Sequence, residues 1–174
     1  MFNGRFGNTS GAPYLETLVI LPRLGIRSGV SFLVDTGADE TVLMPADAIK
    51  MGVDYNKLLR GHPLVGIGGQ CKSFKEQAII ALSDNDRKLL FAYEIDIKIV
   101  DDRAAINKHG YCPSLLGRDI LKHLKMRYDP KERMLVFTLL SADVAIPLNE
   151  RSAQALRKEL RSSVSRRRLP NYPD

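Results

Sequence analysis

The sequence predicts a mainly β domain with short helices, because apolar segments of strand length recur along it and one long stretch alternates between apolar and polar residues. The 174 residues are 44% hydrophobic and 26% charged, which is ordinary for a globular domain large enough to bury its own core. The clearest strand is Phe91–Val100, where charged residues alternate with apolar ones. Three further apolar stretches have strand length: Tyr14–Leu21, Gly29–Val34 and Met134–Leu140.

Two short helices are expected between these strands. The stretch Pro45–Met51 has proline in its first turn and Gly52 after its last residue, the usual signals for the two ends of a helix. The stretch Asp119–Lys125 follows Gly117 and Arg118 and spaces its apolar residues so that they turn toward a core. The predicted fold is therefore a set of strands with small helical insertions.

Composition divides the chain into three parts. Residues 1–13 begin polar and rich in Gly and Asn, and they are expected to be flexible. Residues 14–148 hold the predicted strands and form the domain. In residues 149–174, Asn149 is a candidate N-cap for a basic helix with apolar residues at helical spacing, and the chain beyond Ser162 is expected to be disordered.

The positive charge of the chain gathers in this C-terminal extension. Residues 151–174 carry seven basic and two acidic side chains, or +5, which leaves only +1 of the net +6 for residues 1–150. A short basic tail usually indicates solvation or weak phosphate contact. A nucleic acid is therefore expected as a partner at most weakly, through the tail.

The sequence shows no signal for export, a membrane or a metal. No apolar run approaches the roughly 18 residues of a membrane-spanning helix, and the N-terminus lacks the apolar centre of a signal peptide. A cytoplasmic protein without a membrane partner is expected, and Met1 favours a chain complete as written. Cys71, Cys112 and the three histidines show no metal-site spacing, so we expect free thiols rather than a disulfide, no metal and no cofactor.

The motif that carries chemistry is Asp35-Thr36-Gly37, directly after the apolar stretch Val30–Val34. An acidic side chain at the end of a buried strand is costly unless it is paired or used. Gly37 permits a tight turn that brings backbone close to a bound molecule. On its own, however, the tripeptide also fits an ordinary exit from a strand into a turn, where these residues are common.

Three segments in order extend this motif. Phe32–Leu43 resembles the active-site segment of retroviral and retroviral-like aspartic peptidases almost position by position. Ser114–Leu121 resembles the second signature of that family, in which apolar residues precede Gly-Arg-Asp/Asn and a short helix. Leu64–Gly69 is similar to the glycine-rich tip of the family's flap. The chain is identified as a member of the retropepsin-like aspartic peptidases over about residues 14–140.

This resemblance implies an acid-protease fold, a closed β-barrel or sandwich, that works as a homodimer on polypeptides. Pepsin-like enzymes encode two catalytic aspartates in one long chain, whereas this chain has one Asp-Thr-Gly in half that length. The second Asp35 is therefore expected from a twofold-related partner. Two carboxylates held close together share one proton and polarise the water that attacks a peptide bond.

The resemblance also implies roles for single residues of the turn. Asp35, Thr36 and Gly37 are the catalytic residues; the Thr36 hydroxyl crosses the dimer axis, and the Gly37 carbonyl receives a substrate amide. Ala38 and Asp39 bind substrate backbone.

Further roles fall outside the turn. Arg118, supported by Gly117, orients Asp39 through a fork-shaped ion pair. The flap tip, which closes over the substrate and contacts it, is Gly66, Ile67, Gly68 and Gly69. Taken alone, these four residues also fit an ordinary glycine-rich hairpin loop, and Arg118 fits a solvated arginine at a helix start.

The C-terminal part departs from the pattern of the viral enzymes, which build their dimer from interleaved chain termini. Here a basic extension follows, so the interface strands are left open; Val144–Leu148 is a candidate, with 149–161 packed outside it. The stretch Pro45–Gly61 is also longer than in the compact viral enzymes, and the polar second flap arm Gln70–Gln77 is unusual.

Three functions follow in order of preference. The first is an aspartic endopeptidase that cuts extended polypeptides between two Asp35 carboxylates. The second is a non-catalytic module of the same fold for peptide binding or dimerisation, although a retired site has no reason to keep a costly acid. The third is a nucleic-acid-associated protein that acts through Arg166, Arg167 and Arg168.

Overall fold

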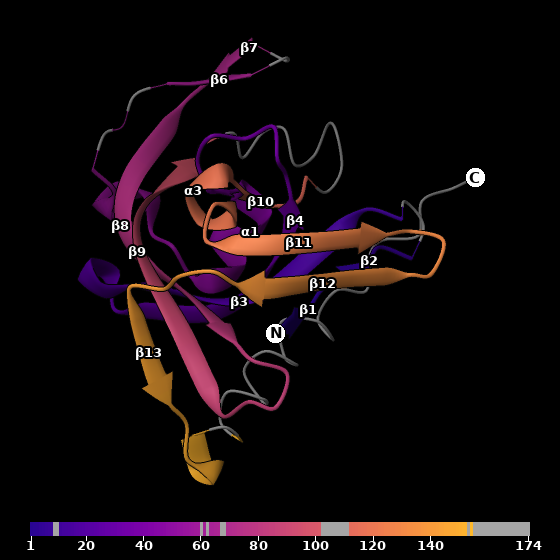
Figure 1. Ribbon diagram of the computed structural model, residues 1–174. Coiled ribbons are helices and arrows are strands. Elements are labelled where there is room, and N and C mark those ends of the chain that lie inside the picture. Colours follow the sequence, from indigo (N-terminus) through magenta and orange to yellow (C-terminus); the bar gives the residue numbers. More distant parts are fainter. Residues whose placement is uncertain are drawn as a thin grey trace.

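The computed structural model describes residues 1–8, 11–59, 61, 63–66, 69–101, 112–152 and 154, and it confirms the mainly β fold (Figure 1). The strands are β1 (Phe2–Asn3), β2 (Arg5–Phe6), β3 (Pro13–Leu21), β4 (Ile26–Val34), β5 (Val42–Leu43), β6 (Leu64–Gly66), β7 (Gly69–Cys71), β8 (Ser73–Ser83), β9 (Leu89–Val100), β10 (Leu115–Leu116), β11 (Leu124–Asp129), β12 (Met134–Leu139) and β13 (Val144–Pro147). The helices are α1 (Pro45–Met51) and α3 (Arg118–Leu121), with 3-10 turns η1 (Pro22–Leu24) and η2 (Tyr55–Lys57).

Six of the described strands close into a barrel. The antiparallel pairs β3–β4 and β8–β9 are joined to each other by β3–β8 pairing. On the other side β9 runs parallel to β5, β5 pairs with β10, and β10 runs parallel to β4, which completes the circle. The side chains that fill the barrel are fully buried, among them Val19, Phe32, Ile80, Ile97 and Leu116.

The alternation in β9 has the predicted orientation. Tyr93, Ile97 and Ile99 are buried in the core, whereas Glu94 and Asp96 are exposed. A strand with this period has one buried face and one polar face, as the sequence indicates.

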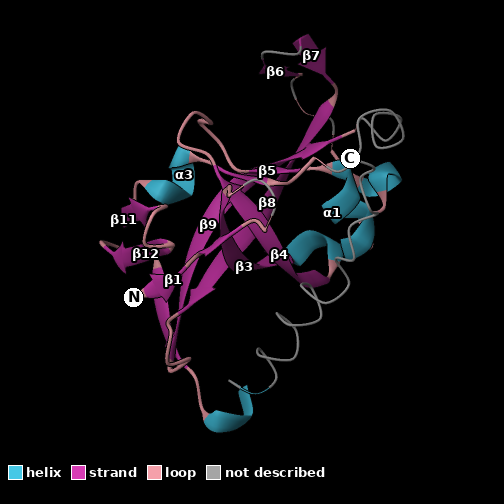
Figure 2. Cartoon of the chain, turned by 90° about the vertical axis from the view of Figure 1, so that its right-hand side faces the viewer, coloured by secondary structure: helices cyan, strands magenta, loops and turns pink. Residues whose placement is uncertain are grey.

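Helix α1 has the predicted bounds. Proline stands at its start, and Gly52 ends it in the left-handed conformation (φ 84°) with its N–H on the carbonyls of Ala48 and Ile49. In Figure 2, α1 and the β1–β12–β11 sheet lie on opposite sides of the barrel strands. None of the helices in the described part of the chain is long and apolar enough to cross a membrane.

Helix α3 is shorter than the predicted Asp119–Lys125. It ends at Leu121, and Leu124 already begins β11, which pairs with β12. The apolar spacing that suggested a longer helix also fits a helical turn followed by a strand, because Leu124 is buried in either arrangement. The second half of that prediction is wrong.

The N-terminal segment, expected to be flexible, contributes strands instead. β1 pairs with β12, and the Gly4 N–H donates to the Leu135 carbonyl at 2.8 Å. Phe2 is only 2% exposed, and its ring meets that of Phe91 edge-on with centroids 5.6 Å apart. Two isolated phenylalanines in a polar segment carry too little pattern to predict this long-range pairing.

At the C-terminal side, β13 pairs antiparallel with β9 of the same chain. Its residues are exposed, including Val144 and Ile146. The Asn149 side chain accepts a hydrogen bond from the Ser152 N–H at 2.9 Å, as expected of an N-cap. The predicted disordered tail beyond Ser162 lies outside the described residues.

We predict that Phe2→Ala lowers the free energy of unfolding by about 3 kcal/mol, because it removes a buried ring and leaves a cavity against Phe91. Denaturant unfolding measures the change. Leu140→Ala is the control, since Leu140 is also a large apolar residue and is 62% exposed. An equal effect of the two substitutions would contradict the burial of Phe2.

Candidate active site

The Asp35 turn begins where β4 leaves the barrel, and β10 holds that end of β4 in place. The Leu33 N–H donates to the Ser114 carbonyl at 2.8 Å, and the Asp35 N–H donates to the Leu116 carbonyl at 3.1 Å. β10 runs parallel to β4 at this point. The turn therefore starts from a hydrogen-bonded end of the barrel and not from a free strand end.

Within the turn, backbone groups orient the Asp35 carboxylate. Its Oδ1 accepts a hydrogen bond from the Gly37 N–H at 2.9 Å, and the Asp35 carbonyl accepts one from the Ala38 N–H at 3.3 Å. Asp35 is half-buried, whereas Thr36 and Gly37 are exposed. Hydrogen bonds within the turn therefore fix its conformation, and Thr36 and Gly37 remain accessible to solvent.

Arg118, the first residue of α3, binds the Asp35 turn through both its side chain and its backbone N–H. Its guanidinium forms an ion pair with Asp39 and donates to the Thr36 carbonyl at 3.2 Å, while its N–H donates to the Ala38 carbonyl at 2.8 Å. The side chains of Arg118 and Asp39 are 57% and 81% exposed. An ion pair this exposed adds little stability, so its effect is to orient the turn.

A second set of contacts to the turn, partly buried, was not predicted from the sequence. The Asp119 carboxylate accepts from the Thr41 N–H at 2.8 Å and from the Thr41 hydroxyl at 2.7 Å. The Thr41 hydroxyl in turn accepts from the Gly117 N–H at 3.2 Å. Asp119 stands in the quoted Gly117-Arg118-Asp119 signature, but the sequence offers no sign that Thr41 is its partner.

A third polar contact ties helix α1 to the same region and was likewise missed. The Ser114 hydroxyl donates to the Asp47 carboxylate at 2.7 Å and accepts from the Met44 N–H at 3.0 Å. Ser114 and Asp47 are both buried. A buried carboxylate needs such donors, and this one holds α1 against the loop segment that leads into β10.

Gly117 lies in close contact with the end of the turn. A Cβ at this position would lie 2.4 Å from the carbonyl carbon of Glu40 and 2.5 Å from its oxygen. Its backbone is extended (φ −87°, ψ 179°), a conformation open to other residues. Lack of space, and not backbone conformation, is therefore what requires glycine here.

Charged residues flank the turn on the side of β9. Glu40 forms an ion pair with Lys98, and the Lys98 N–H donates to the Thr41 carbonyl at 3.2 Å. Lys75 stands opposite Lys98 in the β8–β9 ladder and pairs with Asp96 at 2.9 Å. The hydrogen bond to Asp96 raises the pKa of Lys75 above its ordinary value, which keeps this lysine charged.

Strands β6 and β7 form the hairpin that was predicted as the flap, up to the pair of Gly66 and Gly69. Strands β6 and β7 pair antiparallel, with Gly66 opposite Gly69 as the last described pair. Ile67 and Gly68, predicted to complete its tip, lie outside the described residues. Figure 1 shows β6 and β7 at the top of the molecule, projecting beyond the end of β8.

Two other kinds of reactive group occur among the described residues: cysteine thiols and possible metal ligands. Burial raises the pKa of the Cys112 thiol, which disfavours the nucleophilic thiolate. Within the described ranges, no three His, Cys, Asp or Glu side chains gather as a metal ion would need.

We predict that Gly117→Ala lowers the free energy of unfolding by about 3 kcal/mol, because the added methyl group collides with the Glu40 backbone. Gly25→Ala is the matched control: Gly25 has open space around it and a φ of 65°, so alanine there costs about 1 kcal/mol of backbone strain. Equal losses in denaturant unfolding would show that the contact with Glu40 is unimportant.

One family model matches most of the chain. The family model for retroviral aspartyl proteases matches residues 19–128, which is more than half of the chain. This range includes the Asp35 turn, the β6–β7 hairpin and Gly117-Arg118-Asp119. A search of curated proteins gave no match.

Three solved structures are similar to the chain. They are the EIAV protease complexed with the inhibitor HBY-793 (22% identity, 67% of this chain and 90% of that chain, TM-score 0.43), a retropepsin-like aspartic protease from Rickettsia conorii (22%, 85% and 92%, TM-score 0.51) and the retroviral protease-like domain of Ddi1 from Leishmania major (17%, 79% and 95%, TM-score 0.40). The Rickettsia structure supports the barrel as the fold. Given the extent of the family match, the chain belongs to the retroviral aspartyl protease family.

Proposed function

We propose that the protein is an aspartic endopeptidase whose active site forms between two subunits. The observation that carries this proposal is the single Asp35 carboxylate, oriented by the Gly37 N–H at the end of a barrel strand, in a turn whose next residues are exposed. A carboxylate in this setting is accessible and fixed, which general acid–base chemistry requires.

Hydrolysis at this site needs two carboxylates. One polarises the attacking water while the other group protonates the carbonyl oxygen of the substrate, and the pair shares one proton because like charges at short range do not both ionise. The chain has one Asp-Thr-Gly. A twofold-related copy supplies the second Asp35, with the exposed Thr36 of each chain at the axis.

The substrate is an extended polypeptide that binds alongside the turn. Its backbone bonds with Gly37, Ala38 and Asp39, and the Arg118 guanidinium holds the Asp39 carboxylate for that purpose. The β6–β7 hairpin serves as the flap: Gly66, Ile67, Gly68 and Gly69 close over the peptide and exclude water from the reaction. Arg118 and Gly117 support the site without contacting the reacting bond.

We predict that the wild-type protein cleaves members of a diverse peptide pool between acidic and neutral pH and that Asp35→Asn abolishes the cleavage, because the amide cannot act as the general base. Mass spectrometry of the products measures it. Asp86→Asn is the matched control, since it makes the same chemical change at an exposed position in the β8–β9 turn.

Two outcomes would contradict the proposal. Cleavage that persists in Asp35→Asn would remove Asp35 from the mechanism. A stable wild-type dimer, shown by light scattering, that cleaves nothing in the pool would favour the non-catalytic module for peptide binding or dimerisation.

A mixing experiment tests the shared site directly. When wild type and Asp35→Asn subunits are exchanged to equilibrium in equal amounts, about one quarter of the dimers hold two Asp35 residues. Activity per total wild-type chain should then fall to about half of its unmixed value. Unchanged activity per wild-type chain would mean that each chain carries a complete site.

A further inference from the structure

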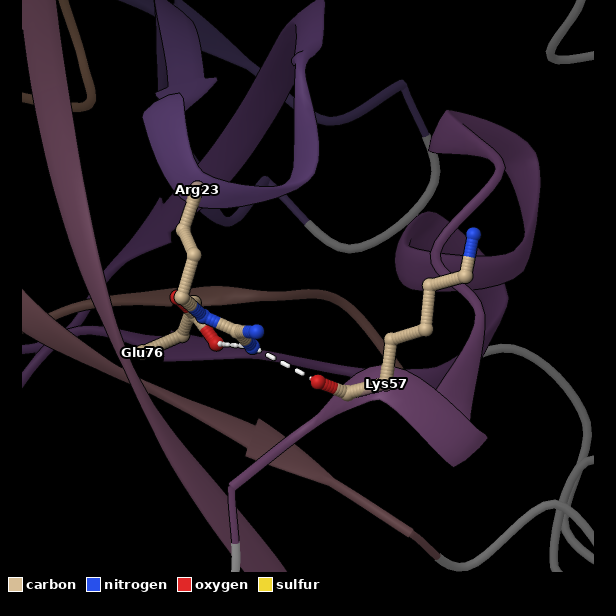
Figure 3. A network of polar contacts seen from close by, with 3 residues as sticks. All are labelled: Arg23, Lys57 and Glu76. Atoms are coloured by element: carbon tan, nitrogen blue, oxygen red, sulfur yellow. Dashed lines mark hydrogen bonds and ion pairs between the residues drawn. The ribbon is translucent and has the colours of Figure 1, made fainter.

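The Arg23 guanidinium joins η1 to η2 and β8, the segments that precede and follow the β6–β7 hairpin along the chain; Figure 3 shows the three residues. Arg23 in η1 donates through Nε to Glu76 Oε1 at 2.8 Å and through Nη2 to Glu76 Oε2 at 2.5 Å. The same Nη2 donates to the Lys57 carbonyl at 2.7 Å. Glu76 belongs to β8, and Lys57 ends η2.

The carboxylate in this network is buried. The side chain of Glu76 is 2% exposed, whereas that of Arg23 is 41% exposed. The hydrogen bond to Glu76 raises the pKa of Arg23, so the guanidinium stays charged. A buried ion pair often adds no more to the free energy of unfolding than apolar residues of the same size would. Its directional hydrogen bonds are better suited to selecting one relative position of the segments that it joins.

The arrangement that Arg23 fixes is the approach of the two legs of the hairpin. Lys57 lies on the leg that enters β6, and Glu76 lies on the leg that leaves β7 through β8. A Cβ on Gly61 would lie 2.8 Å from the Ser73 carbonyl oxygen, so the legs also touch above the guanidinium.

Tyr55 makes further contacts between the two legs and the barrel. The Tyr55 hydroxyl donates to the Val100 carbonyl at 3.0 Å. The Tyr55 ring meets that of Phe74 on the outgoing leg, with centroids 6.1 Å apart. Arg23 therefore acts at a point where both legs already converge, with the hairpin projecting beyond it (Figure 1).

We propose that Arg23 is a positioning residue for the β6–β7 hairpin. By holding Lys57 and Glu76 together, its guanidinium sets the angle at which the hairpin leaves the barrel. Its meaning for catalysis rests on the proposed function, in which the hairpin covers the substrate. Loss of the guanidinium loosens the hairpin at its base and leaves the barrel and the Asp35 turn intact.

The test measures hydrogen exchange of the amides of Leu64–Gly66 and Gly69–Cys71. The variant is the double substitution Arg23→Met with Glu76→Met, which keeps side-chain volume, leaves no buried charge and cannot bridge the legs. Exchange in the hairpin should become about tenfold faster, while exchange in β3 and β4 stays unchanged.

Two single variants calibrate this result. Arg23→Lys keeps the charge but lacks the planar fork that serves Glu76 and Lys57 together, so its hairpin exchange should be intermediate. Arg5→Gln is the matched control. Like Arg23, Arg5 has a partly exposed side chain (38%) and pairs with a glutamate, Glu16, but it lies in β2, which pairs with β3 and not with the hairpin legs. Its hairpin exchange should equal that of wild type.

Activity gives a second readout. In the double variant kcat/KM should fall about tenfold, chiefly through KM, because the hairpin holds the substrate in both the ground and transition states. Hairpin exchange at the wild-type rate, or faster exchange spread equally over β3 and β4, would overturn the inference. If wild type cleaves no peptide but hairpin exchange responds as expected, the proposed function fails and the positioning role stands.

Discussion

The geometry of the site depends on β10, a strand of two residues placed between β4 and β5. It runs parallel to β4 and antiparallel to β5, and these pairings close the barrel. The residues that follow β10, Gly117, Arg118 and Asp119, reach the Asp35 turn from behind. Barrel closure and the orientation of the Asp35 carboxylate are therefore not independent, since a shift of β10 moves both.

Two sets of contacts connect α3 to the turn, and they differ in burial and therefore in the stability that they add. The Thr41 N–H and hydroxyl donate to the Asp119 carboxylate in a partly buried setting, and Thr41 itself is fully buried, so losing these bonds would be costly; they stabilise the return of the chain into β5. The pair of Arg118 and Asp39 lies at the surface and is screened by water and salt. The Thr41 end of the turn is therefore held by stronger contacts than the Asp39 end, which is the end proposed to meet substrate.

The features that the sequence predicts are those formed by residues close together along the chain. Strands β3, β4, β9 and β12, helix α1 and the Asp35 motif are visible as local patterns. The long strand β8 was not predicted, and the end of α3 was misjudged because Leu124 suits both a helix and a strand. The pairing of Thr41 with Asp119 joins residues 78 positions apart, and that of Asp47 with Ser114 joins residues 67 apart. No single-sequence pattern specifies such partners, because each side chain alone also suits a solvated turn or cap.

The hairpin and the Asp35 turn are anchored to the barrel by different strands, and the ladders between them limit how they move relative to each other. β8 carries the hairpin and pairs with β9 along its whole length, and β9 pairs with β5 directly after the turn. Sliding the hairpin toward or away from Asp35 would break these ladders. Tilting it about its base breaks none of them. Arg23, which bonds both legs at that base, opposes this remaining motion.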